Sequence, residues 1–188
     1  MSLRILGGQA KGLEIQVPKA DMIRPTSVLL RRKLFDSYQN LEDYSFIDLC
    51  AGTGAMGLEA LSRKAYSAWF YEKNSKVFNI LKHNIEAYRS RVKSEQVIHI
   101  FKQDFTGFFP IQSNQDKRLI LYFDPPYEQK QLYEQLALLT QDLKGNIELW
   151  VESDRQKGFK QEELELLFPS PRKVFTQGTS YLSIIDKG

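Results

Sequence analysis

Residues 46–57, with the sequence FIDLCAGTGAMG, give the strongest indication of fold in this chain. The first half is an apolar run typical of a buried strand, and the second half begins a helix. Between the two, Gly52, Gly54 and Gly57 satisfy the spacing GxGxxG. Glycines at such a turn permit a tight bend and let a ligand approach the backbone closely. A strand that enters a helix through this loop predicts a nucleotide-type binding site.

Acidic residues near this loop distinguish two classes of cofactor. Asp48 stands four residues before the first glycine; it would repel the pyrophosphate of a dinucleotide and attract the ammonium and sulfonium groups of S-adenosyl-L-methionine. Glu72 ends the next predicted strand, where its carboxylate can accept hydrogen bonds from ribose hydroxyls. Asp104 ends the third, where it can accept the adenine amino group while Phe105 contacts the ring. We therefore expect S-adenosyl-L-methionine as the cofactor.

Strands and helices alternate on both sides of the loop. We expect strands at 45–50, 68–72, 96–102, 119–123 and 147–152, helices at 26–38, 55–63, 75–88, 131–141 and 162–168, and a closing hairpin of 173–177 and 180–186. This order predicts an α/β fold, Rossmann-like, with a mostly parallel seven-stranded sheet and helices on both faces. A terminal hairpin is typical of the S-adenosylmethionine-dependent methyltransferase variant of this sheet.

The N-terminal part of the chain is basic. Residues 1–33 hold seven Lys or Arg and two acids, a local balance of +5, although the whole chain carries only +3. A glycine-containing pattern at 3–17 predicts a β-hairpin. We expect 1–25 to form a basic hairpin arm and linker, 26–188 to form the methyltransferase domain, and Arg4, Lys11 and Arg24 to contact RNA.

The tetrapeptide Asp124-Pro125-Pro126-Tyr127 follows the most apolar predicted strand, at the edge where open α/β sheets bind ligands. Its prolines fix the backbone and leave rigid carbonyl acceptors. Asp124 and the Pro125 carbonyl can accept the two hydrogens of an exocyclic amine and stabilise the charge that develops on it. We expect Tyr127 to stack on the base. The four residues are therefore the predicted catalytic group.

Two further residues receive structural interpretations. Cys50, the only cysteine, is predicted to pack inside the first central strand. Glu152 alternates with Trp150 along the fifth strand and is predicted to support the sheet.

On these motifs the chain resembles the RsmD family, bacterial enzymes that methylate guanine N2 in small-subunit ribosomal RNA. The resemblance is carried by RILGG at 4–8 with KG at 11–12, RPT at 24–26 with KLF at 33–35, DLCAGTGAMGLEALSR at 48–63, Glu72 and DPPY at 124–127. It implies a cofactor site at Asp48, Gly52, Gly54, Glu72 and Asp104, a catalytic DPPY, and ribosomal RNA within a small-subunit particle as substrate. We also expect Ala51 and Phe105 in the cofactor site. The chain departs from the family at Lys33, where Glu is usual, and at Cys50, where Phe is common.

The choice of base stays open between two alternatives. Guanine offers adjacent N1–H and N2–H donors to one carboxylate, whereas the N1 of adenine is an acceptor that an ionised Asp124 would oppose. Adenine-N6 methyltransferases acting on RNA or DNA also use DPPY, but usually with an inserted recognition domain. Only 66 residues separate Gly57 from Asp124, and the predicted elements consume them. Unpaired RNA therefore suits this chain better than duplex DNA.

Composition argues against several other classes. No stretch has the length and apolar character of a membrane-spanning helix, and a single cysteine excludes an intrachain disulfide and a CxxC metal site. We expect a cytoplasmic monomer that needs no metal and no membrane. An NAD-dependent oxidoreductase is disfavoured by Asp48, and a non-catalytic RNA-binding relic is disfavoured by the intact DPPY.

Overall fold

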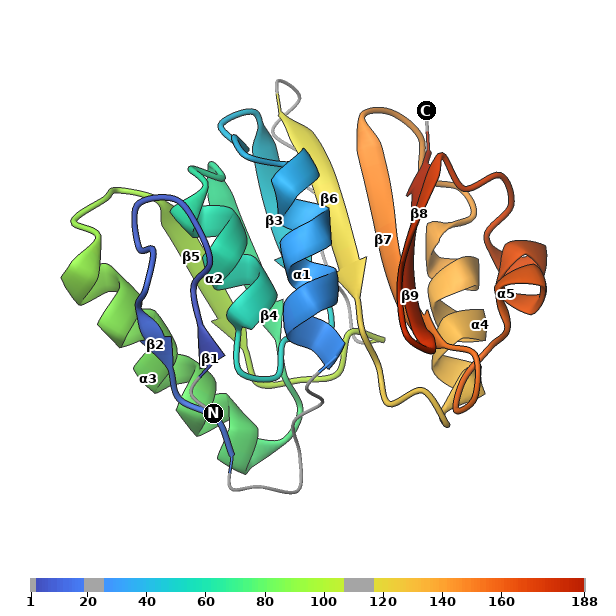
Figure 1. The fold of residues 1–188 in the computed structure, drawn as a ribbon, viewed down its shortest axis with the longest axis horizontal. Helices are drawn as coiled ribbons and strands as arrows, with labels where there is room; N and C mark the ends of the chain where they lie inside the picture. The colour runs from blue at the N-terminus through green and yellow to red at the C-terminus, as the bar shows by residue number, and fades with distance from the viewer. Residues whose placement is uncertain (1–2, 19–25, 107–116, 188) are drawn as a thin grey trace.

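A computed structural model describes residues 3–18, 26–106 and 117–187. Its centre is a seven-stranded sheet with the strand order β5-β4-β3-β6-β7-β9-β8 (Figure 1). The strands are β3 (Tyr44–Asp48), β4 (Ser67–Tyr71), β5 (Val97–Phe101), β6 (Arg118–Phe123), β7 (Ile147–Asp154), β8 (Lys173–Gln177) and β9 (Ser180–Asp186).

The strands β5, β4, β3, β6 and β7 are parallel neighbours, and among the seven strands only β9 runs in the opposite direction. Within the parallel part, Phe46 of β3 pairs with Ala68 of β4 on one side and with Ile120 of β6 on the other. Strand β9 runs antiparallel to both β7 and β8. The prediction of an α/β, mostly parallel seven-stranded methyltransferase sheet with a closing hairpin is confirmed.

Helices cover both faces of the sheet (Figure 1). They are α1 (Thr26–Ser37), α2 (Ala55–Ser62), α3 (Ser75–Arg91), α4 (Lys130–Thr140) and α5 (Gln161–Leu167). The alternation of side chains along β6 shows the two layers: Leu119, Leu121 and Phe123 pack with residues of α4 and α5. Ile120 and Tyr122 point to the opposite face and pack with residues of α1. Strand β6 is therefore buried on both sides, as its apolar sequence predicts.

A two-stranded hairpin, β1 (Leu3–Arg4) and β2 (Glu14–Ile15), lies beside α2 and α3 (Figure 1). The buried carboxylate of Glu59 on α2 accepts hydrogen bonds from the backbone N–H groups of Leu6 at 2.7 Å and Gly7 at 2.9 Å. Gly8 has φ +72°, and a Cβ there would lie 1.9 Å from the carbonyl oxygen of Ser62. The predicted hairpin is thus present and packs directly on the main sheet's helical layer.

The element boundaries differ from the predictions mainly at the ends. Helix α3 continues to Arg91, about one turn past the predicted end, with Arg89 and Arg91 in the last turn where cations interact favourably with the helix dipole. Strand β3 ends at Asp48, so Cys50 lies in the turn after the strand rather than inside it, which corrects the prediction.

Candidate functional site

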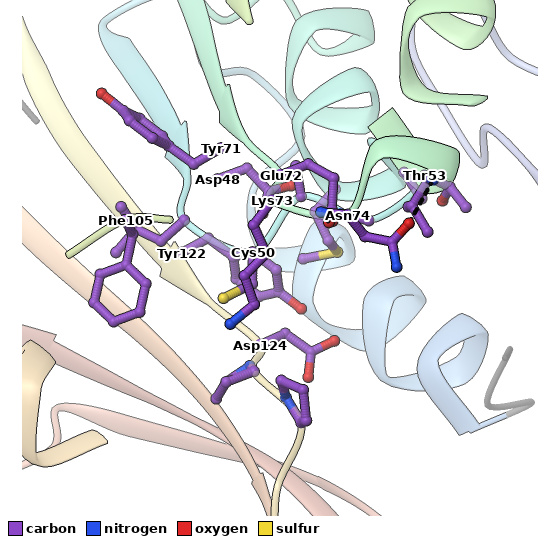
Figure 2. Close-up of a pocket in the computed structure, with 18 of the residues that line it drawn as sticks. Asp48, Cys50, Thr53, Tyr71, Glu72, Lys73, Asn74, Phe105, Tyr122 and Asp124 are labelled. Atoms are coloured by element: carbon purple, nitrogen blue, oxygen red, sulfur yellow. Dashed lines mark hydrogen bonds between the residues drawn. The ribbon is translucent and has the colours of Figure 1, made fainter. Parts of the chain in front are cut away.

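A cavity of about 460 Å³ opens at the carboxyl ends of the parallel strands. Figure 2 shows Asp48, Glu72 and Asp124, which come from three strand ends, gathered around it, with Phe105 to one side. The predicted residues that line the cavity are Asp48, Ala51, Gly52, Glu72, Asp104, Phe105, Asp124, Pro125 and Pro126. Gly54 and Tyr127 are not among the lining residues.

The glycine loop is shaped by its packing against α3. Gly54 has φ +83° and precedes α2, and a Cβ there would lie 2.5 Å from Cδ1 of Leu81. Asn84 of α3 donates from Nδ2 to the carbonyl oxygen of Thr53 at 2.8 Å and to that of Gln16 at 3.0 Å. Gly54 therefore serves the backbone geometry of the loop, and Asn84 connects the loop to the residues that follow β2.

Asp48, the last residue of β3, is a buried acid at the centre of the site. Its side chain is 1% exposed, and its Oδ1 has no hydrogen-bond partner among the described residues. Burial raises the pKa of Asp48 well above its usual value, and the nearby charge of Asp124 raises it further, although backbone N–H groups of Gly57 and Cys50 act in the opposite direction. A cation bound beside Asp48 would favour its ionised form.

Glu72 follows β4 and is half-buried. Its Oε2 accepts a hydrogen bond from the N–H of Gly52 at 3.0 Å, and its Oε1 accepts one from the N–H of Asn74 at 2.7 Å. Burial raises the pKa of Glu72, and these two bonds partly counter that effect. Each oxygen keeps a second lone pair, so Glu72 can support the glycine loop and still accept hydroxyl groups of a ligand.

Asp104 and Phe105 form the part of the cavity next to β5. Asp104 accepts hydrogen bonds from Nζ of Lys73 at 3.0 Å and from the N–H of Thr106 at 3.1 Å. Burial alone would raise the pKa of Asp104, but the bonds from Thr106 and Lys73 outweigh it and lower that pKa. Phe105 is 2% exposed and packs edge-on against Phe123. Lys73 is a part of this site that no sequence motif indicates.

The DPPY segment lies at the end of β6, next to Asp48. Asp124 is half-buried, Pro125 is buried and Pro126 is exposed. A hydrogen bond from the N–H of Gln129 to the carbonyl oxygen of Pro126, at 2.9 Å, closes the turn that follows. The first three residues therefore present a rigid, acid-containing edge to the cavity.

Tyr127 is placed differently from the prediction. Its side chain is 1% exposed, and its hydroxyl donates to Oε1 of Glu152 at 2.9 Å. The ring lies in the protein interior and not in the cavity, so the expectation that Tyr127 stacks on a base is corrected. A tyrosine in this position can bury its ring and still satisfy its hydroxyl with a hydrogen bond to a buried acceptor, which explains this placement.

Three residues near the cavity depart from their sequence interpretation. Glu152 lines the cavity and accepts hydrogen bonds from two tyrosines, in addition to its place in the sheet. Cys50 also lines the cavity. Burial, together with the charge of Asp48, raises the pKa of its thiol, which keeps the thiol protonated. The position of Glu152 at the carboxyl end of the strand next to β6 was the one signal that could have found it.

Arg31 contributes to the positive charge of the basic N-terminal part of the sequence, but it is only 4% exposed. Its guanidinium donates a hydrogen bond to the carbonyl oxygen of Arg4 at 2.7 Å.

Two of the three predicted RNA contacts, Arg4 and Lys11, lie on the hairpin. Arg4 is exposed and forms an ion pair with Glu14 across the hairpin, with 2.6 Å between Nη2 and Oε1. Lys11 is exposed at the hairpin turn. Arg24 lies outside the described residues. Among the described residues of this basic segment, Arg31 is buried and Arg4 is paired, so neither presents an unpaired positive charge at the surface.

The described part of the chain offers neither a metal cluster nor a membrane-spanning helix. No group of three or more His, Cys, Asp or Glu side chains within residues 3–18, 26–106 and 117–187 is arranged to hold a metal ion. Across the same residues, none of the helices combines the length and the apolar character that crossing a membrane requires.

Comparisons with known proteins identify the family of the chain and agree with its fold. The model of a family described as conserved hypothetical protein 95 matches residues 3–175. A protein of Escherichia coli strain K12 named ribosomal RNA small subunit methyltransferase D is 32% identical over 162 residues, which cover 83% of this chain and 77% of that protein. A protein of the same name from Haemophilus influenzae is 28% identical over 158 residues, covering 82% of this chain and 80% of that protein. A solved structure of the Escherichia coli protein yhhF, proposed to be a methyltransferase, is 23% identical, aligns over the full length of both chains with a TM-score of 0.72, and shows the same fold.

Proposed function

Because the chain belongs to the family described as conserved hypothetical protein 95, which is the RsmD family, we propose that it methylates the N2 amino group of a guanine in small-subunit ribosomal RNA. The chain is a methyltransferase of this family. The proposed methyl donor is S-adenosyl-L-methionine, and the proposed substrate is the RNA within a small ribosomal subunit particle.

The observation that carries the proposal is the set of acids at neighbouring strand ends. Asp48, Glu72 and Asp104 end or follow β3, β4 and β5, and Asp124 follows β6 on the other side of β3. A cavity with this excess of carboxylates suits a cationic ligand and disfavours a dinucleotide pyrophosphate. The Oδ1 of Asp48 has no partner among the described residues, and burial raises the pKa of this acid, so a positive charge beside it would favour its ionised form.

The residues present fit S-adenosyl-L-methionine. Asp48 would interact with its amino-acid ammonium, Glu72 would accept the ribose hydroxyls, and Asp104 with Phe105 would receive the adenine. When bound, the cofactor supplies a methyl group on a sulfonium, an electrophile that requires no metal activation. Gly52, with φ +55°, leaves the backbone of the loop open to close approach.

The protein's own contribution to the reaction centres on Asp124. An exocyclic amine is a weak nucleophile because its lone pair is delocalised into the ring. Asp124 and the carbonyl oxygen of Pro125 would accept its hydrogens, hold the nitrogen toward the cofactor side of the cavity, and stabilise the positive charge that develops on it. Since Pro125 and Pro126 fix the backbone, these acceptors are oriented before the substrate binds.

The experiment that tests this function uses RNA that lacks the modification. Small-subunit particles and free small-subunit RNA from cells without this enzyme are incubated with the protein and methyl-labelled S-adenosyl-L-methionine, and the labelled nucleosides are identified after digestion. We expect label in N2-methylguanosine, with more transfer to the particle than to free RNA. Label in N6-methyladenosine, or no transfer to either substrate, would contradict the proposal.

A further inference from the structure

We propose that Glu152, on β7, is a positioning residue for methyl transfer that keeps the catalytic segment 124–126 in place by binding the tyrosines on both sides of it. The inference rests on the proposed function, because it concerns the same segment. It adds a residue that the DPPY motif does not include.

The contacts of Glu152 are arranged on both sides of the catalytic segment. Its side chain is 4% exposed, Oε2 accepts a hydrogen bond from the hydroxyl of Tyr122 at 2.8 Å, and Oε1 accepts one from the hydroxyl of Tyr127 at 2.9 Å. Tyr122 precedes Asp124 by two residues, and Tyr127 follows it by three. One carboxylate on the neighbouring strand therefore binds the chain before and after Asp124-Pro125-Pro126.

Strand pairing sets this geometry. Strands β6 and β7 are parallel neighbours, with Tyr122 opposite Trp150 and Phe123 opposite Val151. The chain leaves β6 after Phe123, whereas β7 continues to Asp154. Glu152 thus stands on the strand that extends past the end of β6, beside the segment that no longer pairs with it. The backbone carbonyl of Glu152 also accepts a hydrogen bond from the hydroxyl of Tyr133 at 3.0 Å.

The residues after β7 enclose Tyr127 from another side. A Cβ added at Gly158 would lie 3.1 Å from Cβ of Tyr127 and 2.6 Å from Oγ of Ser153. The backbone of Gly158 therefore approaches Tyr127 closely, and its N–H donates to the carbonyl oxygen of Asp154 at 2.8 Å. The side chain of Tyr127 is thus packed against Gly158 near its Cβ and bonded to Glu152 at its hydroxyl.

This arrangement links Glu152 to the reaction through the position of the catalytic segment. The acceptors on Asp124 and Pro125 act only if they point at the amino group, and a displacement of about 1 Å at such a site can cost about 10²-fold in rate. Removal of the Glu152 carboxylate takes a buried acceptor away from both tyrosine hydroxyls, which disfavours the present packing. The predicted effect is on the rate of methyl transfer, since the proposed cofactor contacts lie on β3, β4 and β5.

The same strand offers a matched control at Glu148. Glu148 is 2% exposed and accepts hydrogen bonds from the hydroxyl of Tyr38 at 2.7 Å and from Nε1 of Trp150 at 3.0 Å. It is a buried, tyrosine-bound glutamate on β7 like Glu152, but it lies four residues earlier and does not line the cavity. Glu148 also forms ion pairs with Arg118 at 2.8 Å and with Arg172 at 3.2 Å, so its removal should destabilise the fold at least as much as removal of Glu152. A purely structural role for Glu152 therefore predicts rate losses in the Glu148 variants that are at least as large.

The test compares Glu152→Gln, Glu152→Ala and Tyr127→Phe with Glu148→Gln and Glu148→Ala. For each folded variant, cofactor affinity is measured by calorimetry, single-turnover methyl transfer to small-subunit particles is measured with the labelled cofactor, and backbone hydrogen exchange is measured at residues 127–129. We expect Glu152→Ala to lower the single-turnover rate about 10²-fold, with cofactor affinity nearly unchanged and exchange at 127–129 accelerated. Glu152→Gln keeps an acceptor oxygen and should recover much of the rate.

A double-mutant cycle tests the route through Tyr127. If Glu152 acts by binding this tyrosine, the variant with both Glu152→Ala and Tyr127→Phe should be little slower than Glu152→Ala alone, whereas independent effects would multiply. Should Glu152→Ala fail to fold, Tyr127→Phe still removes the bond to Oε1 of Glu152: a lower rate with faster exchange at 127–129 would support the proposal, and a wild-type rate and exchange would overturn it.

Three results would overturn the proposal: a wild-type rate in folded Glu152→Ala, rate losses of equal or greater size in the Glu148 variants, or multiplying effects in the cycle. Absence of methyl transfer by the wild-type protein would instead contradict the proposed function. In that case the hydrogen-exchange measurement still tests the positioning role. Faster exchange at residues 127–129 in Glu152→Ala, but not in Glu148→Ala, would support it. Equal exchange rates at these residues in the two variants would contradict it.

Discussion

Asp48 ends strand β3, Asp124 follows the adjacent parallel strand β6, and the two carboxylates interact electrostatically. Burial raises the pKa of Asp48 well above its usual value, and the charge of Asp124 raises it further. Two acids so placed are unfavourable unless a proton or a cation lies between them. The cavity therefore favours a positively charged ligand, and in the absence of that ligand the two acids lower the stability of the folded protein.

The first prediction concerns the pH dependence of cofactor binding. A cation beside Asp48 favours the ionised carboxylate, so binding of S-adenosyl-L-methionine should release protons and should weaken as the pH falls. Calorimetry from about pH 5 to about pH 9 in two buffers of different ionisation enthalpy measures this release. Asp124→Asn removes the second cause of the raised pKa of Asp48, so the pH dependence should move to lower pH. Binding with no proton release, and with the same pH profile in both proteins, would contradict the interaction.

The second prediction concerns stability. Because the pKa of Asp48 is raised by folding, the folded state holds the proton more tightly than the unfolded state, and stability is lost as the pH rises through the folded pKa. Asp48→Asn should therefore raise the Tm at neutral pH, by about 2–4 °C for each kcal/mol recovered, while it abolishes cofactor binding. Thermal unfolding at neutral pH and at about pH 4 checks the sign, since the gain should shrink at the lower pH. The exposed Asp142 provides the control, because Asp142→Asn should leave the Tm nearly unchanged at both pH values.

The third prediction concerns Glu72. Glu72→Ala removes both the proposed ribose acceptor and the bonds to the N–H groups of Gly52 and Asn74, and it should weaken cofactor binding by about 1.5–3 kcal/mol. Glu72→Gln keeps one acceptor oxygen and should weaken binding less. Titration calorimetry on folded variants measures both, with the exposed Glu86→Ala on α3 as a control. Unchanged affinity in Glu72→Ala would remove this residue from the cofactor site.

Much of this fold could be predicted from sequence because its signals are local and periodic. The apolar run of β6, the glycine loop after β3 and the carboxyl-end acids each occupy a few consecutive residues, and the strand order of a parallel α/β sheet then brings Asp48, Glu72, Asp104 and Asp124 to one edge.

What could not be predicted depends on contacts between distant residues. Nothing in DPPY shows that the hydroxyl of Tyr127 bonds a glutamate 25 residues later, so the ring was expected in the cavity. The sequence does not show that Arg31 is buried, because its burial depends on the packing of α1 against the hairpin and the sheet. The alternation of Glu148, Trp150 and Glu152 correctly indicates one face of a strand, but only the extension of β7 beyond the end of β6 separates the roles of the two glutamates.

The fourth prediction concerns the hairpin and RNA. Lys11 is exposed at the hairpin turn, whereas Arg4 is paired with Glu14. Lys11→Ala should weaken RNA binding. It should also make the slope of log affinity against log salt concentration shallower, by about 0.7 for each single-strand phosphate that the side chain no longer neutralises. Glu14→Gln should strengthen RNA binding, because it releases Arg4 and removes a negative charge. Filter binding over a salt series measures both effects. Identical slopes in wild type and the Lys11 variant would show that the hairpin does not bind phosphates.

The role of Asp124 in methyl transfer is measured by single-turnover methylation with Asp124→Asn, on guanine and on adenine in the same RNA context. If the carboxylate accepts hydrogens from the guanine edge, the Asn amide presents a donor in place of one acceptor. We expect a decrease of about 10²–10³ in the rate on guanine, with cofactor affinity changed only slightly. A wild-type rate on guanine in this variant would contradict the role of Asp124 and, with it, the proposed mechanism.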